Sequence, residues 1–263
     1  MIVHAGESDV APTAMLERLT LLLDAFNDTR SMTLAQIVDR TGLPRSSAHR
    51  MLGRLVDMQW LHRHGHEYQL GTRLIELGSI ALHQNSLRSA AAPILQELHR
   101  STGYLIHLGV LDGKDALYLD KIGGRLTTEL PTRVGQRYPA HTSALGRVLL
   151  AHPPNDSGNT ARLDPGLRRI REAGVAYELR RAGSIATIAA PIGRAGSVVA
   201  ALSICGPSTH LEFDHRHAAP VRAAASAIMQ TLNGHRGIAA PIPLGSRARA
   251  TDTTNPNHYL RFA

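Results

Sequence analysis

Apolar side chains recur at helical spacing near the start of the chain, and this pattern predicts two helices. The first covers residues 14–28, where leucines and one phenylalanine recur every three or four positions. The second begins at Thr33, because a threonine followed three residues later by Gln36 is typical of a capping box. It ends at Gly42, since glycine readily adopts the left-handed conformation that closes a helix.

A third helix follows Pro44, which suits the first turn of a helix because its missing N–H has no partner there. The helix extends to about Met58, with an apolar stripe formed by Ala48, Met51, Leu52 and Leu55. The period then changes. Segments 60–63 and 67–70 flank a turn at Gly65, which predicts a β-hairpin.

The second half of the chain alternates between strand-like and helix-like patterns. The expected helices cover residues 87–101, 141–151, 164–173 and 214–232, and the expected strands cover residues 104–111, 116–122, 127–133, 184–192 and 197–205. This order predicts an α+β domain built on an antiparallel sheet with flanking helices. The full organisation is then a disordered N-terminus (1–13), a winged helix-turn-helix domain (14–72), a linker helix (73–86), the α+β domain (87–234) and a flexible tail (235–263).

Composition narrows the class of protein. Apolar residues make up 43% of the 263 residues, yet no apolar run approaches the ~20 residues that span a bilayer. The N-terminus lacks the layout of a signal peptide. Cys205 is the one cysteine, so a disulfide within the chain and a cysteine zinc site are both excluded. We therefore expect a cytoplasmic protein without a membrane partner.

Charge is unevenly distributed over the first third of the chain. Residues 1–43 carry three arginines and six acids, whereas residues 44–73 carry five arginines against two acids. The positive charge therefore lies on the third helix and the hairpin. A solvated surface would also account for it, but charge clustered on one helix favours nucleic acid. Aromatic residues are only 4% of the chain, which argues against a surface for stacking single-stranded bases.

Two helices joined by a short turn and followed by a hairpin form the layout of a winged helix-turn-helix, which predicts binding to double-stranded operator DNA. The third helix buries its apolar stripe and leaves a polar face for the major groove. Residues near its N-terminus are best placed for bases, and Arg50 and Arg54 for phosphates. The predicted DNA-binding residues are Thr33, Arg45, Ser46, Ser47, His49, Arg50, Arg54, Arg63, His64 and His66.

Other chemistries find little support. His62, His64 and His66 alternate and would share one face of a strand, but no acid or cysteine accompanies them, so no metal site is expected. The chain has no Gly-x-Ser-x-Gly elbow, P-loop or dinucleotide fingerprint. His141 and Ser143 lack an orienting acid, and Cys205 lies in an apolar strand without an activating environment. We expect no catalytic residues and no cofactor.

Taken together, these residues resemble the IclR family of bacterial regulators. The N-terminal likeness lies in Leu34–Ile37, Thr41–Pro44, Ser46–Leu52, Leu55 and Tyr68–Gly71, and the C-terminal likeness in Pro139–Ala151, Ile188–Ile192 and Ala200–Pro207. The resemblance covers about residues 14–232, and it is the two halves at this spacing that make it specific.

The resemblance implies a GAF-like C-terminal domain, a homodimer or dimer of dimers, and DNA binding controlled by a small-molecule effector. An organic or aromatic acid of a catabolic pathway would suit the hydroxyls, thiol and free backbone N–H groups of the implied pocket. The implied effector-binding residues are Leu130, Tyr138, Ser143, Ala144, Leu145, Ile185, Thr187, Ser203 and Cys205.

Three departures from the family pattern bear on that pocket. The link 152–164 is shorter than usual, which predicts that a helix or strand at the pocket's edge is missing. Glu178–Arg181 is basic where many members are acidic, which predicts a more positive pocket, and Thr187 stands where many members carry cysteine. Strand filling would also account for Thr187, Ser203 and Cys205. The alternative function is therefore a DNA-binding regulator whose C-terminal domain only dimerises and has lost effector binding.

Overall fold

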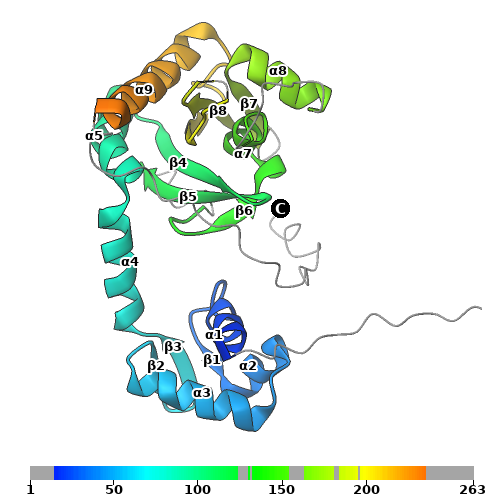
Figure 1. Ribbon diagram of the computed structural model, residues 1–263. Coiled ribbons are helices and arrows are strands. Elements are labelled where there is room, and N and C mark those ends of the chain that lie inside the picture. The colour runs from blue at the N-terminus through cyan, green and yellow to red at the C-terminus, as the bar shows by residue number, and fades with distance from the viewer. Residues whose placement is uncertain are drawn as a thin grey trace, which may run out of the picture. The chain divides into compact units, whose positions relative to one another are not determined.

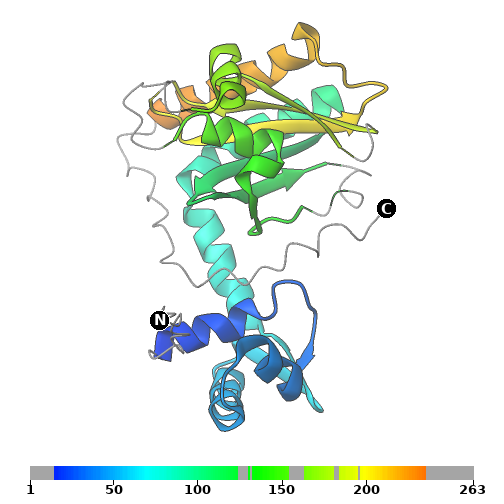
Figure 2. The same cartoon turned by 90° about the vertical axis from the view of Figure 1, so that its right-hand side faces the viewer.

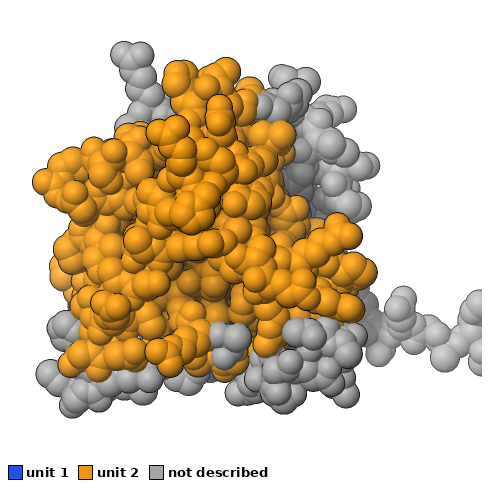
Figure 3. All heavy atoms as spheres, turned by 90° about the horizontal axis from the view of Figure 1, so that it is seen from above, with its two compact units in different colours: residues 1–82 blue, residues 83–263 orange. Residues whose placement is uncertain are grey.

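A computed structural model describes residues 15–123, 130, 132–153, 163–180, 184–194 and 196–234 of the chain. The chain divides into two compact units, residues 1–82 and residues 83–263, which are coloured separately in Figure 3; the face visible there belongs to the second unit. Each unit has its own hydrophobic core. No helix in the described ranges has the length and apolar character needed to cross a bilayer.

The described part of the first unit contains helices α1, α2 and α3, a small antiparallel sheet and most of a further helix, α4 (Thr72–Gln84) (Figure 1). The first three helices are α1 (Met15–Asp24), α2 (Leu34–Thr41) and α3 (Arg45–Asp57). The strands are β1 (Met32–Thr33), β2 (Leu61–His64) and β3 (Glu67–Leu70), in the order β1-β3-β2. This is the predicted winged helix-turn-helix, with β2 and β3 forming the wing.

Local sequence explains where α2 begins and ends. The backbone N–H of Thr33 donates to Gln36 Oε1 at 2.8 Å, and the N–H of Gln36 donates to Thr33 Oγ1 at 3.4 Å, so the predicted capping box is present. Gly42 closes the helix at φ +66°, a conformation that costs glycine little. Pro44 lies just before α3 rather than inside its first turn, and α3 has no side-chain cap.

Helix α4 (Thr72–Gln84) follows the wing and crosses the boundary between the two units. None of its residues is buried. Ile75 is 70% exposed, Leu77 37% and Ile80 51%, which is unusual for three large apolar side chains on one helix. Leu77 and Ile80 are three residues apart and lie on one side of the helix, whereas Ile75 leaves it on another side.

The second unit is a six-stranded antiparallel sheet with helices on both faces, which confirms the predicted α+β class. Its strands are β4 (Leu105–Asp112), β5 (Asp115–Ile122), β6 (Arg137–Pro139), β7 (Ala176–Arg180), β8 (Ile185–Ile192) and β9 (Ala200–Pro207), in the order β6-β5-β4-β9-β8-β7. Its helices are α5 (Ser86–Thr102), α7 (Ala144–Leu150), α8 (Pro165–Ala173) and α9 (His215–Gly234), with a 3₁₀ turn η1 (Ala140–Thr142).

The two faces of this sheet differ in chemistry. Helices α5 and α9 pack together against one face, where the main apolar core of the unit lies (Figure 2). Helix α7 contacts β4, β7, β8 and β9 from the other side. Gly146 allows α7 to lie directly on η1, because a Cβ at this position would collide with the backbone of Ala140. The ligand chemistry predicted from sequence falls on the α7 face.

Several predicted boundaries were wrong. Helix 14–28 ends at Asp24, where a tighter i→i+3 bond from Phe26 N–H to Leu23 O takes over. The helix predicted over 141–151 is split into η1 and α7, because Ser143 is extended at φ −137° and caps a new helix. The strand predicted over 197–205 begins at Ala200, since the backbone N–H of Ser197 donates to the carbonyl oxygen of Arg194 at 2.8 Å instead of joining the sheet.

Three short strands were not predicted: β1, β6 and β7. Of the strand predicted over 127–133, residues 127–129 and 131 lie outside the described residues, and residues 132–133 are not in a strand. The N-terminal segment 1–13, the tail 235–263 and residues 154–162 of the short link also lie outside them.

Candidate nucleic-acid interface and ligand site

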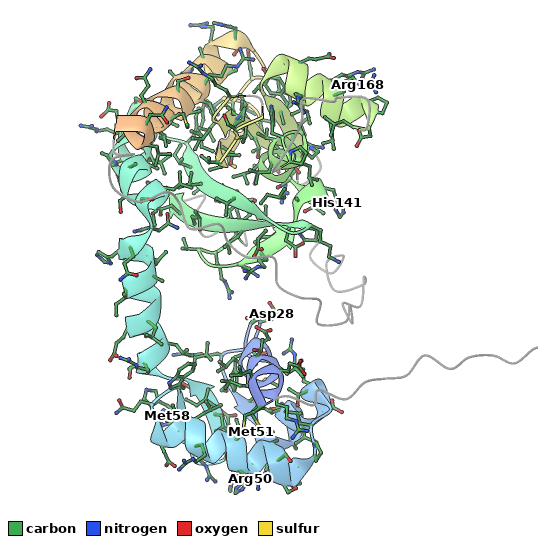
Figure 4. All side chains as sticks on the ribbon, viewed as in Figure 1. Asp28, Arg50, Met51, Met58, His141 and Arg168 are labelled. Carbon is green, nitrogen blue, oxygen red and sulfur yellow. The ribbon has the colours of Figure 1, made fainter. Side chains whose placement is uncertain are left out.

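Helix α3 has one buried and one exposed side. The predicted apolar stripe, Ala48, Met51, Leu52 and Leu55, is buried in the core of the first unit. Figure 4 shows Met51 lying between α3 and α1, whereas Arg50 projects from the outer side of α3. A helix with this division of sides can bury one face in its own domain and present the other to the major groove.

Six of the ten predicted DNA-binding residues line one groove, which we call the wing groove. It lies between α3, the start of α2 and the hairpin, and has a volume of about 880 Å³. The residues lining it are Thr33, Leu34, Ala35, Arg45, Ser46, His49, Arg63, His66 and Tyr68. The structure therefore brings the N-terminal part of α3 and the wing together around one groove.

Two of these residues are held by local contacts. Arg63 Nε donates to the carbonyl oxygen of Gly65 at 2.9 Å, and its guanidinium lies 5.6 Å from the centre of the Tyr68 ring. The arginine is thus fixed at the rim of the wing by a hydrogen bond and a cation–π contact. Thr33 lines the groove, but its hydroxyl already takes part in the cap of α2 with Gln36.

The other predicted residues lie elsewhere. Ser47, Arg50 and Arg54 line a second, smaller groove on the α1 side of α3. His64 ends β2 and lines neither groove. The three alternating histidines do not share one strand face, because β2 ends at His64 and Gly65 turns the chain before His66. Within the described ranges no three His, Cys, Asp or Glu side chains are placed to hold a metal.

The arginines of α3 carry uncompensated charge. Arg45, Arg50 and Arg54 form no ion pair with any residue that the structure describes. By contrast, Arg40 pairs with Asp28 at 3.7 Å and Arg73 with Glu76 at 2.7 Å in the same unit. Exposed guanidiniums on one helix, with no ion-pair partner among the described residues, create a local positive potential that favours a polyanion.

In the second unit, strand register places the predicted ligand residues in rows across the α7 face. His107 on β4 pairs with Lys121 on β5 and with Ser203 on β9. The next row runs through Leu105, Cys205, Thr187 and Glu178, on β4, β9, β8 and β7. We call His107, Thr187, Ser203 and Cys205 the polar band; all four are buried.

His107 lies at the centre of the polar band. One ring nitrogen, Nε2, is 2.8 Å from Thr132 Oγ1, and the other, Nδ1, is 3.6 Å from Cys205 Sγ. Burial lowers the pKa of His107 to about 3, with further lowering from the positive charges of Lys121 and Arg180. At neutral pH the imidazole is therefore uncharged, and it offers one donor and one acceptor.

Cys205 is a structural rather than a reactive thiol. It accepts a hydrogen bond from Thr187 Oγ1 at 3.3 Å. Burial raises the pKa of Cys205 to about 11, and this effect outweighs the lowering by the Thr187 hydroxyl. The thiolate is the nucleophilic form of cysteine, so this environment gives Cys205 no nucleophilic role at neutral pH.

A pair of opposite charges borders the polar band. Arg180 Nε donates to Glu178 Oε1 at 2.7 Å, and Arg180 Nη2 donates to the carbonyl oxygen of Thr142 at 2.6 Å. The other Glu178 oxygen accepts from the backbone N–H of Ala144 at 2.6 Å. The basic character expected for 178–181 is thus partly neutralised, since Glu178 is the partner of Arg180.

Two backbone N–H groups at the start of α7 already have partners within the protein. The N–H of Ala144 is bonded to Glu178, and the N–H of Gly146 donates to Ser143 Oγ at 3.0 Å. Ser143 itself is buried and serves as the N-cap of α7. Any ligand that uses these donors has to replace a side chain of the protein.

The apolar residues predicted for the site fall into two clusters. Leu130 and Ile185 pack with Leu105 and Cys205. Tyr138, Ala144 and Leu145 belong to the α7 cluster, which also contains Tyr118. Tyr118 connects the clusters to the polar band, because its ring lies 5.2 Å from that of His107 and 5.5 Å from that of Tyr138.

Sequence reasoning missed His107, Tyr118, Lys121 and Thr132. A single histidine in a strand whose other residues are mostly apolar is the signal that points to His107. Lys121 follows from register alone, since it lies opposite His107 on the neighbouring strand. Its ammonium donates to the carbonyl oxygens of Leu130 and Thr132 at 2.9 and 2.7 Å. Thr132 contacts the sheet through long-range hydrogen bonds: its carbonyl oxygen accepts one from Lys121, and its hydroxyl forms one with His107.

These features define a class of protein: a winged helix-turn-helix unit followed by an α+β unit with a polar band on its sheet. Comparisons place the chain within this class. Residues 15–65 match the IclR helix-turn-helix domain, and residues 79–162 match the C-terminal domain of the bacterial transcriptional regulator IclR. The chain belongs to the IclR family of bacterial transcriptional regulators.

Individual relatives agree. The HTH-type transcriptional regulator KipR of Bacillus subtilis is 35% identical over 136 residues, which cover 51% of this chain and 54% of KipR, so the chain spans about half the length of that relative. KdgR of Dickeya chrysanthemi is 28% identical over 218 residues, covering 74% of this chain and 72% of KdgR. Among solved structures, an IclR homologue from Microbacterium hydrocarbonoxydans complexed with 4-hydroxybenzoate has a TM-score of 0.71 and 29% identity, covering 84% of this chain and all of that one.

Replacement of His107 by asparagine is expected to change how stability depends on pH. The pKa of His107 lies below that of a histidine in an unfolded chain, so the unfolded state binds more protons as pH falls below about 6.5. The wild-type free energy of unfolding should therefore fall towards acid pH, by up to about 1.4 kcal/mol per pH unit from this residue.

Denaturant titrations from pH 7.5 to 4.5 measure this effect. We expect His107→Asn to be about 1–3 kcal/mol less stable at pH 7.5, because Thr132 loses its buried partner. The difference from wild type should then shrink as pH falls. A difference that stays constant over this range would contradict a buried, neutral His107.

Proposed function

We propose that this chain binds double-stranded operator DNA through its first unit, and that a small organic acid bound at the polar band of the second unit controls this binding. The observation that carries the DNA-binding part is the wing groove. It combines Arg45, Ser46 and His49 of α3 with Arg63 and His66 of the wing. Guanidinium, hydroxyl and imidazole groups on an exposed helix and its wing are the donors that read base edges and hold phosphates.

The order of residues along α3 suggests their roles. Arg45, Ser46 and His49 lie at the N-terminal end, the part of a recognition helix that reaches base edges. Arg63 is held at the rim by Gly65 and Tyr68, which suits a contact to the backbone or minor groove. The DNA-binding unit thus separates base reading on α3 from backbone contact on the wing.

Arg45→Ala should weaken binding to a specific duplex by about 10–100-fold, because a lost bidentate contact to a base is worth roughly 1–3 kcal/mol. The duplex is first selected from a random-sequence library with the wild-type protein, and affinity is then measured by fluorescence anisotropy. Arg40→Ala is the matched control, since Arg40 pairs with Asp28 and lines neither groove. An unchanged affinity of Arg45→Ala for the selected duplex would contradict base reading by the N-terminal end of α3.

The effector part of the proposal is supported by the chemistry of the α7 face. The polar band supplies hydroxyl, thiol and neutral imidazole groups, and Tyr118 and Tyr138 supply aromatic edges. At its border Arg180 binds a carboxylate of the protein itself, that of Glu178. A ligand carboxylate that displaces Glu178 would find the same guanidinium. Because a solved homologue at 29% identity carries 4-hydroxybenzoate, an aromatic acid is the first candidate.

Variants of the Arg180–Glu178 pair should change acid binding in opposite directions. Arg180→Gln should weaken binding of 4-hydroxybenzoate about tenfold or more, because it removes the positive partner of the carboxylate. Glu178→Gln should strengthen it several-fold, because a neutral amide competes less for Arg180. Isothermal titration calorimetry measures both, with 4-hydroxybenzamide as the uncharged control ligand.

The same titrations test the alternative function. A C-terminal domain that only dimerises would bind neither 4-hydroxybenzoate nor any member of a panel of aromatic and aliphatic acids. If Arg180→Gln and Glu178→Gln bind an acid with the same affinity as the wild type, effector binding is supported but the proposed role of Arg180 is contradicted.

We also propose that the chain forms a homodimer, or a dimer of dimers, through α4. Its apolar side chains Ile75, Leu77 and Ile80 are exposed within the chain, and burial against a second copy would remove this surface from water. A dimer also suits an operator with two half-sites, since a twofold protein reads a palindromic sequence.

The double variant Leu77→Glu/Ile80→Glu should shift the chain towards monomer, because two carboxylates on one side of α4 would have to be buried in the interface. Analytical ultracentrifugation at micromolar concentration measures the change. Ser79→Glu on the same helix is the control for added charge. An unchanged sedimentation coefficient in the double variant would place the dimer contact elsewhere.

A further inference from the structure

A second groove lies on the other side of α3, between this helix and α1; we call it the α1 groove. Its volume is about 300 Å³. Two methionines supply apolar lining and the remaining side chains are three arginines and a serine: Met15, Met51, Arg18, Arg50, Arg54 and Ser47. None of the described residues that line it is acidic. Arg18 comes from α1, a helix that the predicted DNA-binding set did not include.

The two grooves lie on opposite flanks of α3. Ser47, Arg50 and Arg54 are spaced i, i+3 and i+7, so their side chains leave the helix on one side. Arg45 and His49 are spaced i and i+4 and leave on the other, towards the wing. The exposed surface of α3 thus lies between two basic flanks.

A helix in the major groove of DNA has a phosphodiester backbone on each side. The groove is about 12 Å wide and a helix with its side chains is about 10–12 Å across, so flanking side chains lie at the height of the phosphates. If α3 enters the groove, the wing flank faces one backbone and the α1 flank faces the other.

We infer that the α1 groove binds a backbone phosphate of duplex DNA, and that Arg18 is part of this phosphate site together with Arg50 and Arg54. This inference rests on the proposed DNA-binding function. The guanidiniums of Arg50 and Arg54 form no ion pair with any described residue, and a phosphate in the groove would accept charge-assisted hydrogen bonds from them and from Arg18. Guanidinium forks match the geometry of phosphate oxygens. Arg18 is half-buried on α1, which limits its mobility and aids preorganisation.

The site reads no base sequence, so any duplex tests it. We would titrate a fluorescein-labelled 30-base-pair duplex of arbitrary sequence with full-length protein at several KCl concentrations, and repeat the titration with a second, unrelated duplex. Arg18→Gln should weaken binding several-fold on both duplexes. It should also lower the magnitude of the slope of log Kobs against log [KCl] by about 0.9 per subunit. The reason is that a variant with one phosphate contact fewer releases fewer counterions when it binds.

Three further variants sharpen the test. Arg54→Gln should act like Arg18→Gln, whereas Arg18→Lys keeps the charge and should keep the salt slope. Arg40→Gln is the matched control, since Arg40 lies on the same unit, pairs with Asp28 and lines neither groove. Circular dichroism and sedimentation of each variant show whether it is folded and has the same oligomeric state as the wild type.

The outcomes separate this inference from the function on which it rests. If wild type binds neither duplex at low salt, DNA binding itself is overturned. If wild type binds and folded Arg18→Gln keeps both its affinity and its salt slope, the phosphate site is overturned and DNA binding survives. A loss of affinity that coincides with loss of the dimer would assign Arg18 to subunit contact instead and would also overturn the site.

Discussion

The antiparallel register of β4, β9 and β8 is the constraint on which the second unit depends. Because side chains alternate between the two faces of a sheet, Ile106, Leu202 and Ile188 face the α5–α9 layer. His107, Ser203 and Thr187 then have to face α7. A slip of one residue in any of these strands would exchange the two sets and place polar groups in the main core. The packing of the main core and the position of the polar band are therefore determined by the same strand pairing.

The first unit obeys a comparable rule with a different period. The buried stripe of α3 occupies one side of the helix, and the charges on the rest of its surface fall on two flanks. The capping box at Thr33 and the left-handed Gly42 determine where α2 starts and ends, and so where α3 can begin. Local backbone chemistry thus positions the surface that we propose to meet DNA.

The sequence was sufficient where a residue's role depends on near neighbours. Patterns that span two to four residues predict the capping box at Thr33 and the turn at Gly65. Patterns of the same length predict the strands β4, β5 and β8. The misses involve partners far apart in the chain. Strand β7 is short and carries Glu178 and Arg180 in a polar run, so only its pairing with β8 makes it a strand. His107 and Thr132 lie 25 residues apart and meet only in the folded unit.

The burial of Cys205 has a practical consequence. It is the only cysteine in the 263 residues, it is 4% exposed, and its pKa is raised to about 11. A maleimide or disulfide reagent will therefore find no reactive thiol while the second unit is folded. The wild-type chain already serves as a cysteine-free background for spin labels or fluorophores attached through one engineered surface cysteine. Slow labelling of Cys205 itself would then report each opening of the sheet on which the polar band lies.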